Sequence, residues 1–209
     1  MQQDLLPLFP LQVVLFPRTP LPLHIFEDRY KQMMAEVIPG HAEFGIVLAA
    51  DQGIVNTGCT AVVEKVLKKY SDGRLDLLAF GRRRFEIFLL NEEKPYLRGA
   101  VHFFDDEDPE AIPLDAQRRA IEGFQEACRL ESSAQIEEPE LSDPQLSFQL
   151  AQAIPDLEFR QVLLNTRSEA GRIRQLADYF PKFISRQKHI AHLRDVAPKN
   201  GHGTIPDQH

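Results

Sequence analysis

The chain has 209 residues, of which 43% are hydrophobic and 26% charged, a composition typical of a folded protein with a substantial core. The net charge of −7 argues against nucleic acid as the main partner, and two cysteines are too few for a disulfide framework or a zinc site. No apolar run approaches the ~20 residues that span a bilayer, and no basic segment of a secretory signal begins the chain. We therefore expect a cytoplasmic protein that has no membrane segment.

Residues 1–110 are predicted to form a β-rich domain. Short aliphatic and aromatic runs recur here, each bounded by Gly, Asn, Asp or Pro, which is typical of strands. Asp72-Gly73 between two of these runs predicts a hairpin, and prolines beside the first runs predict edge strands. The expected strands are Leu5–Phe9, Val13–Phe16, Glu43–Ala50, Thr60–Tyr70, Leu75–Phe80, Arg84–Leu90 and Tyr96–Phe104.

One helix is predicted to interrupt these strands, over Phe26–Ile38. Its apolar residues recur at helical spacing and would form one buried face, and Pro39-Gly40 would end it. The residues of that face are Phe26, Tyr30, Met33 or Met34, and Val37.

Residues 111–196 are predicted to form a helical bundle, and residues 197–209 a flexible tail rich in Gly, Pro and polar residues. Helices are expected over Asp115–Glu131, from Ser142/Asp143, from Pro155-Asp156 and after a Ser168 cap. Pro181 should kink or split the last of them. Strands followed by helices indicate the α+β class.

The motifs of common enzymes are absent from the sequence. It contains no phosphate-binding loop, no dinucleotide-binding glycine motif and no nucleophile elbow, so we expect no cofactor and no catalytic residue. His189 and His192 would lie on neighbouring turns of one helix, but two ligands leave a zinc site incomplete, and we expect no metal. A hydrolase of unknown type is kept only as a remote alternative.

A local basic patch is conceivable around Arg82, Arg83 and Arg84, with Lys68, Lys69 and Arg74 on the preceding hairpin. A phosphate or an RNA backbone could use such a patch. The simpler interpretation is that these charges are solvated and protect the sheet from edge-to-edge pairing.

The N-terminal segment resembles the opening of the Lon protease N-terminal domain. It reads Leu6-Pro7-Leu8-Phe9-Pro10-Leu11, then Val14-Leu15-Phe16-Pro17, then Pro20-Leu21-Pro22-Leu23-His24-Ile25-Phe26-Glu27-Asp28-Arg29-Tyr30. Gly81-x-x-Arg84-Phe85-x-Ile87 and Tyr96-Leu97-x-Gly99-x-Val101 follow in the family's order. The resemblance extends over roughly residues 5–180 and is closest in the β-rich half.

The resemblance implies a PUA-like β pseudo-barrel followed by a helical subdomain. In full Lon proteases this region is associated with substrate recognition and assembly, and it precedes an ATPase and a Ser–Lys protease domain. The chain ends before either, so we expect a stand-alone, non-enzymatic module that binds unfolded or partner polypeptide, with adaptor activity and self-association as further options. An RNA-binding module is the alternative, prompted by the PUA-like fold and the arginine run.

Candidate binding residues come from the shared motif and from aromatic residues. A crevice between the sheet and the helices is the default place for a ligand. Glu27 and Arg29 are expected on different sides of their helix, tying its start to neighbouring strands, and one of Phe103 and Phe104 should face solvent near the crevice. The full set is Phe9, Phe16, Phe26, Glu27, Arg29, Tyr30, Phe103 and Phe104, with Arg82, Arg83 and Arg84 for the RNA alternative.

Overall fold

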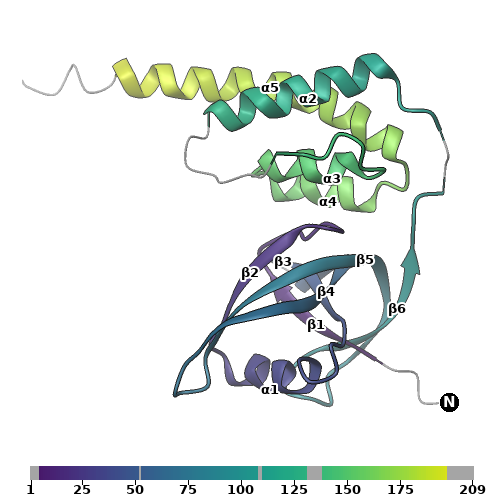
Figure 1. Cartoon of the computed structure of the whole chain (residues 1–209), viewed down its shortest axis with the longest axis vertical. Helices are drawn as coiled ribbons and strands as arrows, with labels where there is room; N and C mark the ends of the chain where they lie inside the picture. Colours follow the sequence, from purple (N-terminus) through teal and green to yellow (C-terminus); the bar gives the residue numbers. More distant parts are fainter. Residues whose placement is uncertain (1–4, 52, 108–109, 131–137, 197–209) are drawn as a thin grey trace, which may run out of the picture.

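The computed structural model describes residues 5–51, 53–107, 110–130 and 138–196, and its first half is a closed β-sheet (Figure 1). The strands follow the order β2-β5-β4-β3-β1-β6, and β6 also pairs with β5, which closes the last five into a barrel. The strands are β1 (Leu6–Leu11), β2 (Pro20–Ile25), β3 (Phe44–Ala50), β4 (Gly53–Lys69), β5 (Leu75–Asn91) and β6 (Arg98–Phe104).

Strand β5 makes the closure possible because it has two successive neighbours along one edge. Its residues 75–80 pair with β2, and its residues 84–91 pair with β6. Along its other edge, β5 pairs with β4 from Leu75 to Glu86. The predicted hairpin between β4 and β5 is confirmed, but Leu75–Phe80 and Arg84–Leu90 are parts of one strand rather than two.

The expected strand over Val13–Phe16 is wrong. Val14, Leu15 and Phe16 form a loop and are all buried, because consecutive side chains of this loop reach the core without strand alternation. The strand that was not foreseen is β2, which contains Pro20 and Pro22. An edge strand tolerates prolines at alternate positions, since every second N–H of such a strand faces away from the sheet.

Helix α1 (Asp28–Val37) lies at one end of the barrel, opposite the C-terminal helices (Figure 1). Tyr30, Met33, Met34 and Val37 are buried, as the helical spacing predicted. Phe26 is the exception, because the helix begins at Asp28 and leaves the Phe26 side chain 59% exposed.

The C-terminal helices are α2 (Leu114–Leu130), α3 (Leu146–Leu150), α4 (Leu157–Asn165) and α5 (Glu169–Val196), with a short 3₁₀ turn over Ala151–Ala153. None of the helices that the structure describes is long and apolar enough to cross a membrane. The proposed boundary at residues 110/111 stays a prediction, and the predicted tail over 197–209 lies outside the described residues.

Two of the predicted helix starts are confirmed by their caps. The Asp156 carboxylate accepts a hydrogen bond from the Phe159 N–H at 3.0 Å, and Ser168 Oγ accepts one from the Gly171 N–H at 3.1 Å. The helix expected from Ser142/Asp143 begins several residues later, at Leu146. Asp143 accepts from the Gln145 N–H and so stabilises a turn, after which α3 begins.

Helix α5 contains Pro181 and continues through it, so the alternative that this proline splits the helix is wrong. Helix α2 packs closely on α5 at Gly123, where a Cβ atom would lie 2.5 Å from the Cβ of Phe180. Buried side chains from α1, the barrel and the C-terminal helices form one continuous core. The sheet and the helices are therefore packed as a single body.

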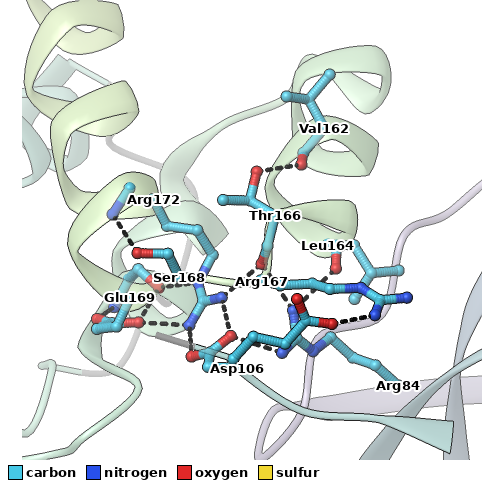
Figure 2. A network of polar contacts seen from close by, with 12 residues as sticks. Arg84, Asp106, Val162, Leu164, Thr166, Arg167, Ser168, Glu169 and Arg172 are labelled. Atoms are coloured by element: carbon cyan, nitrogen blue, oxygen red, sulfur yellow. Dashed lines mark hydrogen bonds and ion pairs between the residues drawn. The ribbon is translucent and has the colours of Figure 1, made fainter. Parts of the chain in front are cut away.

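A buried polar network fixes the helices to the barrel (Figure 2). Asp106, just beyond β6, accepts a hydrogen bond at 2.6 Å from Arg84 of β5 and two at 2.6 Å from Arg172 of α5. Arg84 also donates to the carbonyl oxygens of Leu164 and Thr166 at the end of α4. We call this the Asp106 network.

Charge is nearly balanced inside the Asp106 network. The side chains of Arg84 and Arg172 are 1% and 0% exposed, and Glu169 supplies a second carboxylate, 2.7 Å from Arg172. Burial raises the pKa of Asp106, but hydrogen bonds and charge from Arg172 and Arg84 outweigh it and hold that pKa below its usual value. Burial lowers the pKa of Arg84, and the nearby Arg172 charge lowers it further.

The loop before β2 approaches β5 so closely that only glycine fits at position 81. A Cβ there would lie 2.1 Å from the carbonyl oxygen of Phe16, and the Gly81 N–H donates to the carbonyl of Thr19 at 2.9 Å.

We predict that Gly81→Ala lowers the free energy of unfolding by about 2–3 kcal/mol, because the backbone must move apart. Urea unfolding measures this. Gly40→Ala is the control, since no atom lies within 4 Å of its Cβ, and an equal loss in both variants would contradict the account.

Asp106→Asn is expected to lower stability at neutral pH by on the order of 3 kcal/mol, because it removes the negative charge between two buried guanidinium groups. The folded-state pKa of Asp106 is lowered, so its stabilisation is fully present above the unfolded value of about 3.9 and is lost as pH falls through the folded value. Urea unfolding at neutral pH and at about pH 3 should show the difference between variant and wild type shrinking on acidification.

The control for that prediction is Asp115→Asn. Asp115 also pairs with arginines, Arg118 and Arg119, and its pKa is lowered too, but its side chain is 64% exposed. Water screens an exposed pair, so this variant should remain close to the wild type at every pH. A difference for Asp106→Asn that stays constant from neutral to acidic pH would contradict a role for its charge.

Candidate functional site

Two hollows adjoin on the outer surface of β4 and β5, next to the helices. The first has a volume of about 550 Å³ and the second about 500 Å³, and they share Glu64 and Phe80. We call the combined feature the β4–β5 groove. Its remaining lining residues are His41, Val62, Val63 and Arg82 in the first hollow, and Arg18, Pro20, Leu78, Glu138, Glu140, Asp143, Gln149 and Gln152 in the second.

Strand register makes the floor of the groove apolar. Phe80 of β5 lies directly opposite Pro20 of β2 and Val62 of β4. Directly paired residues of antiparallel strands point to the same side of a sheet, so these three form one row across the outer surface. Leu78 points to the same side two residues earlier on β5, while Leu77 and Ala79 are buried in the core. The floor is therefore a strip of partly exposed apolar side chains.

The rim of the groove is acidic where the helical part meets the barrel. Glu138 and Glu140 come from the segment before α3, and Glu64 comes from β4. Asp143 lies in the same rim, but Arg18 forms an ion pair with it at 3.1 Å. Gln149 accepts from the Glu140 N–H at 2.7 Å and donates to Asp143 at 2.7 Å, which orders this segment.

Backbone strain is concentrated at the two ends of the groove. Among the described residues, the non-glycine positions with positive φ are Arg18 (61°) and His41 (47°), and each lines one of the hollows. A non-glycine residue in this region costs on the order of 1–2 kcal/mol, and such positions cluster at functional sites. Arg18 is held there by its N–H, which donates to the carbonyl of Gly81 at 2.9 Å.

Among the described residues, the groove contains neither a metal-binding cluster nor a cysteine. Within the described ranges, no three His, Cys, Asp or Glu side chains lie close enough together to hold a metal ion. Cys59 lies inside the barrel, where burial raises the pKa of its thiol to about 12 and keeps it protonated at neutral pH. The described groove residues thus combine an apolar floor with a charged rim.

Two of the aromatic residues expected to bind a ligand lie in the core instead. Phe9 is 5% exposed and packs on Tyr30 with ring centroids 4.1 Å apart. Phe16 is 0% exposed and stacks on Phe148 at 5.1 Å. Neither side chain is exposed, because Phe9 points from strand β1 toward α1 and the loop that carries Phe16 lies against α3.

The other residues of the shared motif lie at the α1 end of the barrel, away from the groove. Glu27 and Arg29 form an ion pair with each other at 2.7 Å, so the expectation that they lie on different sides and tie the helix to neighbouring strands is wrong. Tyr30 is buried, with the Arg29 guanidinium 4.6 Å from its ring centroid. Phe26 is exposed and stacks on His24. The motif therefore mainly stabilises the fold.

One member of the pair Phe103 and Phe104 faces solvent, as predicted. Phe103 is 38% exposed, and the Arg83 guanidinium covers one side of its ring at 3.8 Å. Phe104 is 6% exposed and packs under Arg84 and Arg167 beside the Asp106 network. Neither residue lines the β4–β5 groove.

The three arginines of the less favoured RNA alternative do not form one patch, and Arg84 also departs from the simpler interpretation of solvated charges. Arg84 is buried in the Asp106 network, and Arg83 forms an ion pair with Glu43 at 3.0 Å. Arg82 alone of the three lines the groove. Strand alternation accounts for part of this outcome, since Arg83 and Arg84 project to opposite sides of β5.

The groove residues themselves were not foreseen. Val62, Leu78 and Phe80 look like ordinary strand residues in the sequence, and only the register of β2, β5 and β4 places them in one row. Glu138 and Glu140 are 58 or more positions along the chain from Phe80 and reach it only through the packing of the helices. Strand alternation in the sequence could have indicated which residues of β5 point outward. It could not have indicated which residues of β2 and β4 lie beside them.

Comparisons with known proteins agree on one family. The model of the ATP-dependent protease La (LON) substrate-binding domain matches residues 5–181. A Lon protease of Parabacteroides distasonis is 29% identical over 116 residues, which are 51% of this chain and 14% of that protein, so the match spans a small part of the relative's length.

Two solved structures share the fold. A Lon N-terminal domain protein from Xanthomonas campestris has a TM-score of 0.65 and 24% identity, over 84% of this chain and 98% of that one. The N-terminal domain of a Mycobacterium avium complex Lon protease has a TM-score of 0.59 and 13% identity, over 85% and 98%. The family model extends over most of the chain, and the fold is that of these N-terminal domains. The chain therefore belongs to the Lon substrate-binding domain family.

Proposed function

We propose that this chain is a non-enzymatic module that binds unfolded or partner polypeptide in the β4–β5 groove. The observation that carries the proposal is the row of apolar side chains exposed beside the acidic rim. The family is described as the substrate-binding domain of a protease, and the substrates of proteases are polypeptides. A concave apolar surface with a few polar groups is the usual form of such a site.

The groove suits an extended segment for two further reasons. Its floor extends along β5 from Leu78 to Phe80 and across to Val62 of β4, so alternate side chains of a peptide lying along β5 could contact Leu78 and Phe80 in turn. The side-chain amide of Gln152 borders the second hollow and offers a donor and an acceptor to a peptide backbone, whereas Gln149 is already bonded to Glu140 and Asp143. In this proposal, apolar contacts supply affinity, and the amide hydrogen bonds fix the position of the bound peptide.

The proposed function includes a cellular role as well as a binding activity. The module would act in the cytoplasm as an adaptor or regulator in protein quality control, delivering bound polypeptide to a separate protease. Its match covers 14% of the Lon protease of Parabacteroides distasonis, so the ATPase and peptidase activities of a whole Lon protease are not transferred to it. Self-association is the competing option for the partner, and a dimer would appear in sedimentation velocity.

RNA binding is the weaker candidate. It depended on three neighbouring arginines, and two of them are occupied by Asp106 and Glu43. The rim carboxylates Glu64, Glu138 and Glu140 would also repel a phosphate backbone at the groove. No feature of the described residues favours RNA over polypeptide.

Phe80→Gln should weaken the binding of a permanently unfolded, reduced and alkylated protein about tenfold, because it removes the central apolar contact of the floor. Fluorescence anisotropy with the labelled unfolded protein measures the dissociation constant. Circular dichroism on the same samples checks that the variant keeps its fold.

The matched control is Phe88→Gln. Phe88 lies on the same strand, is 61% exposed, and borders a separate apolar hollow of about 360 Å³ with Ile54 and Leu90. It should bind the unfolded protein as the wild type does. The reverse pattern, with Phe88→Gln defective and Phe80→Gln normal, would place the binding surface on that second hollow and refute the groove.

A further inference from the structure

We propose that the β4–β5 groove selects segments in which a lysine or arginine adjoins apolar residues, with the basic side chain held by Glu64, Glu138 and Glu140. This selectivity rests on the proposed polypeptide binding and specifies which polypeptides are preferred. We call these three residues the rim carboxylates.

Nothing in the described part of the chain forms an ion pair with the rim carboxylates. Among the residues that the structure describes, no Lys, Arg or His nitrogen lies within 4 Å of the carboxylate of Glu64, Glu138 or Glu140. Glu140 accepts a single hydrogen bond from its own segment, from Ser142 Oγ at 3.1 Å. Asp143 differs, because Arg18 pairs with it. The second hollow therefore carries three uncompensated negative charges around an apolar floor.

A small cation does not explain this arrangement. No three acidic, histidine or cysteine side chains of the described residues approach closely enough to coordinate a metal ion. The carboxylates are instead spread around a hollow of about 500 Å³, between β4 and the segment before α3. Such spacing suits a long side chain, whose aliphatic stem lies on Leu78 and Phe80 while its charged head reaches the rim.

The charge changes sign along the groove. Its far end is lined by Arg82 and His41, whereas the rim carboxylates lie beside the helical part. Phe80 and Glu64 lie where the two hollows meet. A bound segment would accordingly place its basic residue toward the helices and any acidic residue toward Arg82. Complementary charges of this kind contribute more to the choice of partner than to affinity.

Three matched fluorescent peptides test the selectivity. Each contains the same leucines in a Gly/Ser background and differs at one central position, which is Arg, Gln or Glu. Anisotropy titrations with the intact chain should rank them Arg tightest and Glu weakest, with about three- to tenfold between Arg and Gln at low salt. The Arg preference should decrease as salt is raised, because exposed charges are screened.

The variant Glu64→Gln/Glu138→Gln/Glu140→Gln should bind the Arg and Gln peptides with equal affinity. The control variant Glu92→Gln/Glu93→Gln/Glu158→Gln changes the net charge equally at exposed positions outside the groove and should keep the Arg preference. A rim variant that still prefers the Arg peptide, or a control that loses the preference, would overturn the assignment.

The outcomes separate the two proposals. Equal binding of all three peptides by the wild type would remove the selectivity and leave polypeptide binding standing, whereas binding of none would remove the proposed function itself. Sedimentation velocity on the same samples tests a second copy as the occupant. A dimer that is abolished by the rim variant would show that the groove is a self-interface and would overturn the proposal.

Discussion

The arrangement of the whole molecule depends on one carboxylate, that of Asp106, held between two buried guanidinium groups. Arg84 belongs to the barrel and Arg172 to the last helix, so the same anion is bound by both halves of the chain. A buried cation without its counter-ion is strongly unfavourable, so neither half can move away without exposing or isolating a charge. The Asp106 network thereby fixes where the segment before α3 lies, and that segment forms the rim of the β4–β5 groove.

The family's most recognisable motif and the β4–β5 groove overlap only at Pro20 in this protein. The proline- and aromatic-rich opening places Phe9, Phe16 and Tyr30 in the core, and Glu27 pairs with a neighbour two residues away. The groove is built from strand residues and from a loop whose sequences carry no distinctive pattern. A motif that identifies a family can therefore describe how the domain folds and say little about what it contacts.

The sequence predicts most of the local structure for physical reasons. Helical spacing identified the buried side of α1, and short polar residues before apolar runs identified the starts of α4 and α5. Where a prediction from the sequence was wrong, long-range packing determined the local structure. Val14 to Phe16 became a buried loop because the covering helices surround it, and Pro20 became part of a strand because β5 had a free edge. Arg84, in a run that looked solvated, is buried because Asp106 and two carbonyl groups surround it.

Strand β5 has a consequence for how such a module could diversify. It is hydrogen-bonded along both edges and carries the groove floor at Phe80, the close approach at Gly81 and the anchor at Arg84 within five positions. Changes at Gly81 or Arg84 would disturb the architecture, whereas the partly exposed Phe80 can change with less effect on the fold. Glu138 and Glu140 are exposed and belong to no helix or strand, so their side chains can be exchanged at less structural cost than that of the buried Asp143. Related chains can thus inherit the same floor and acquire new preferences by altering the loop that borders it.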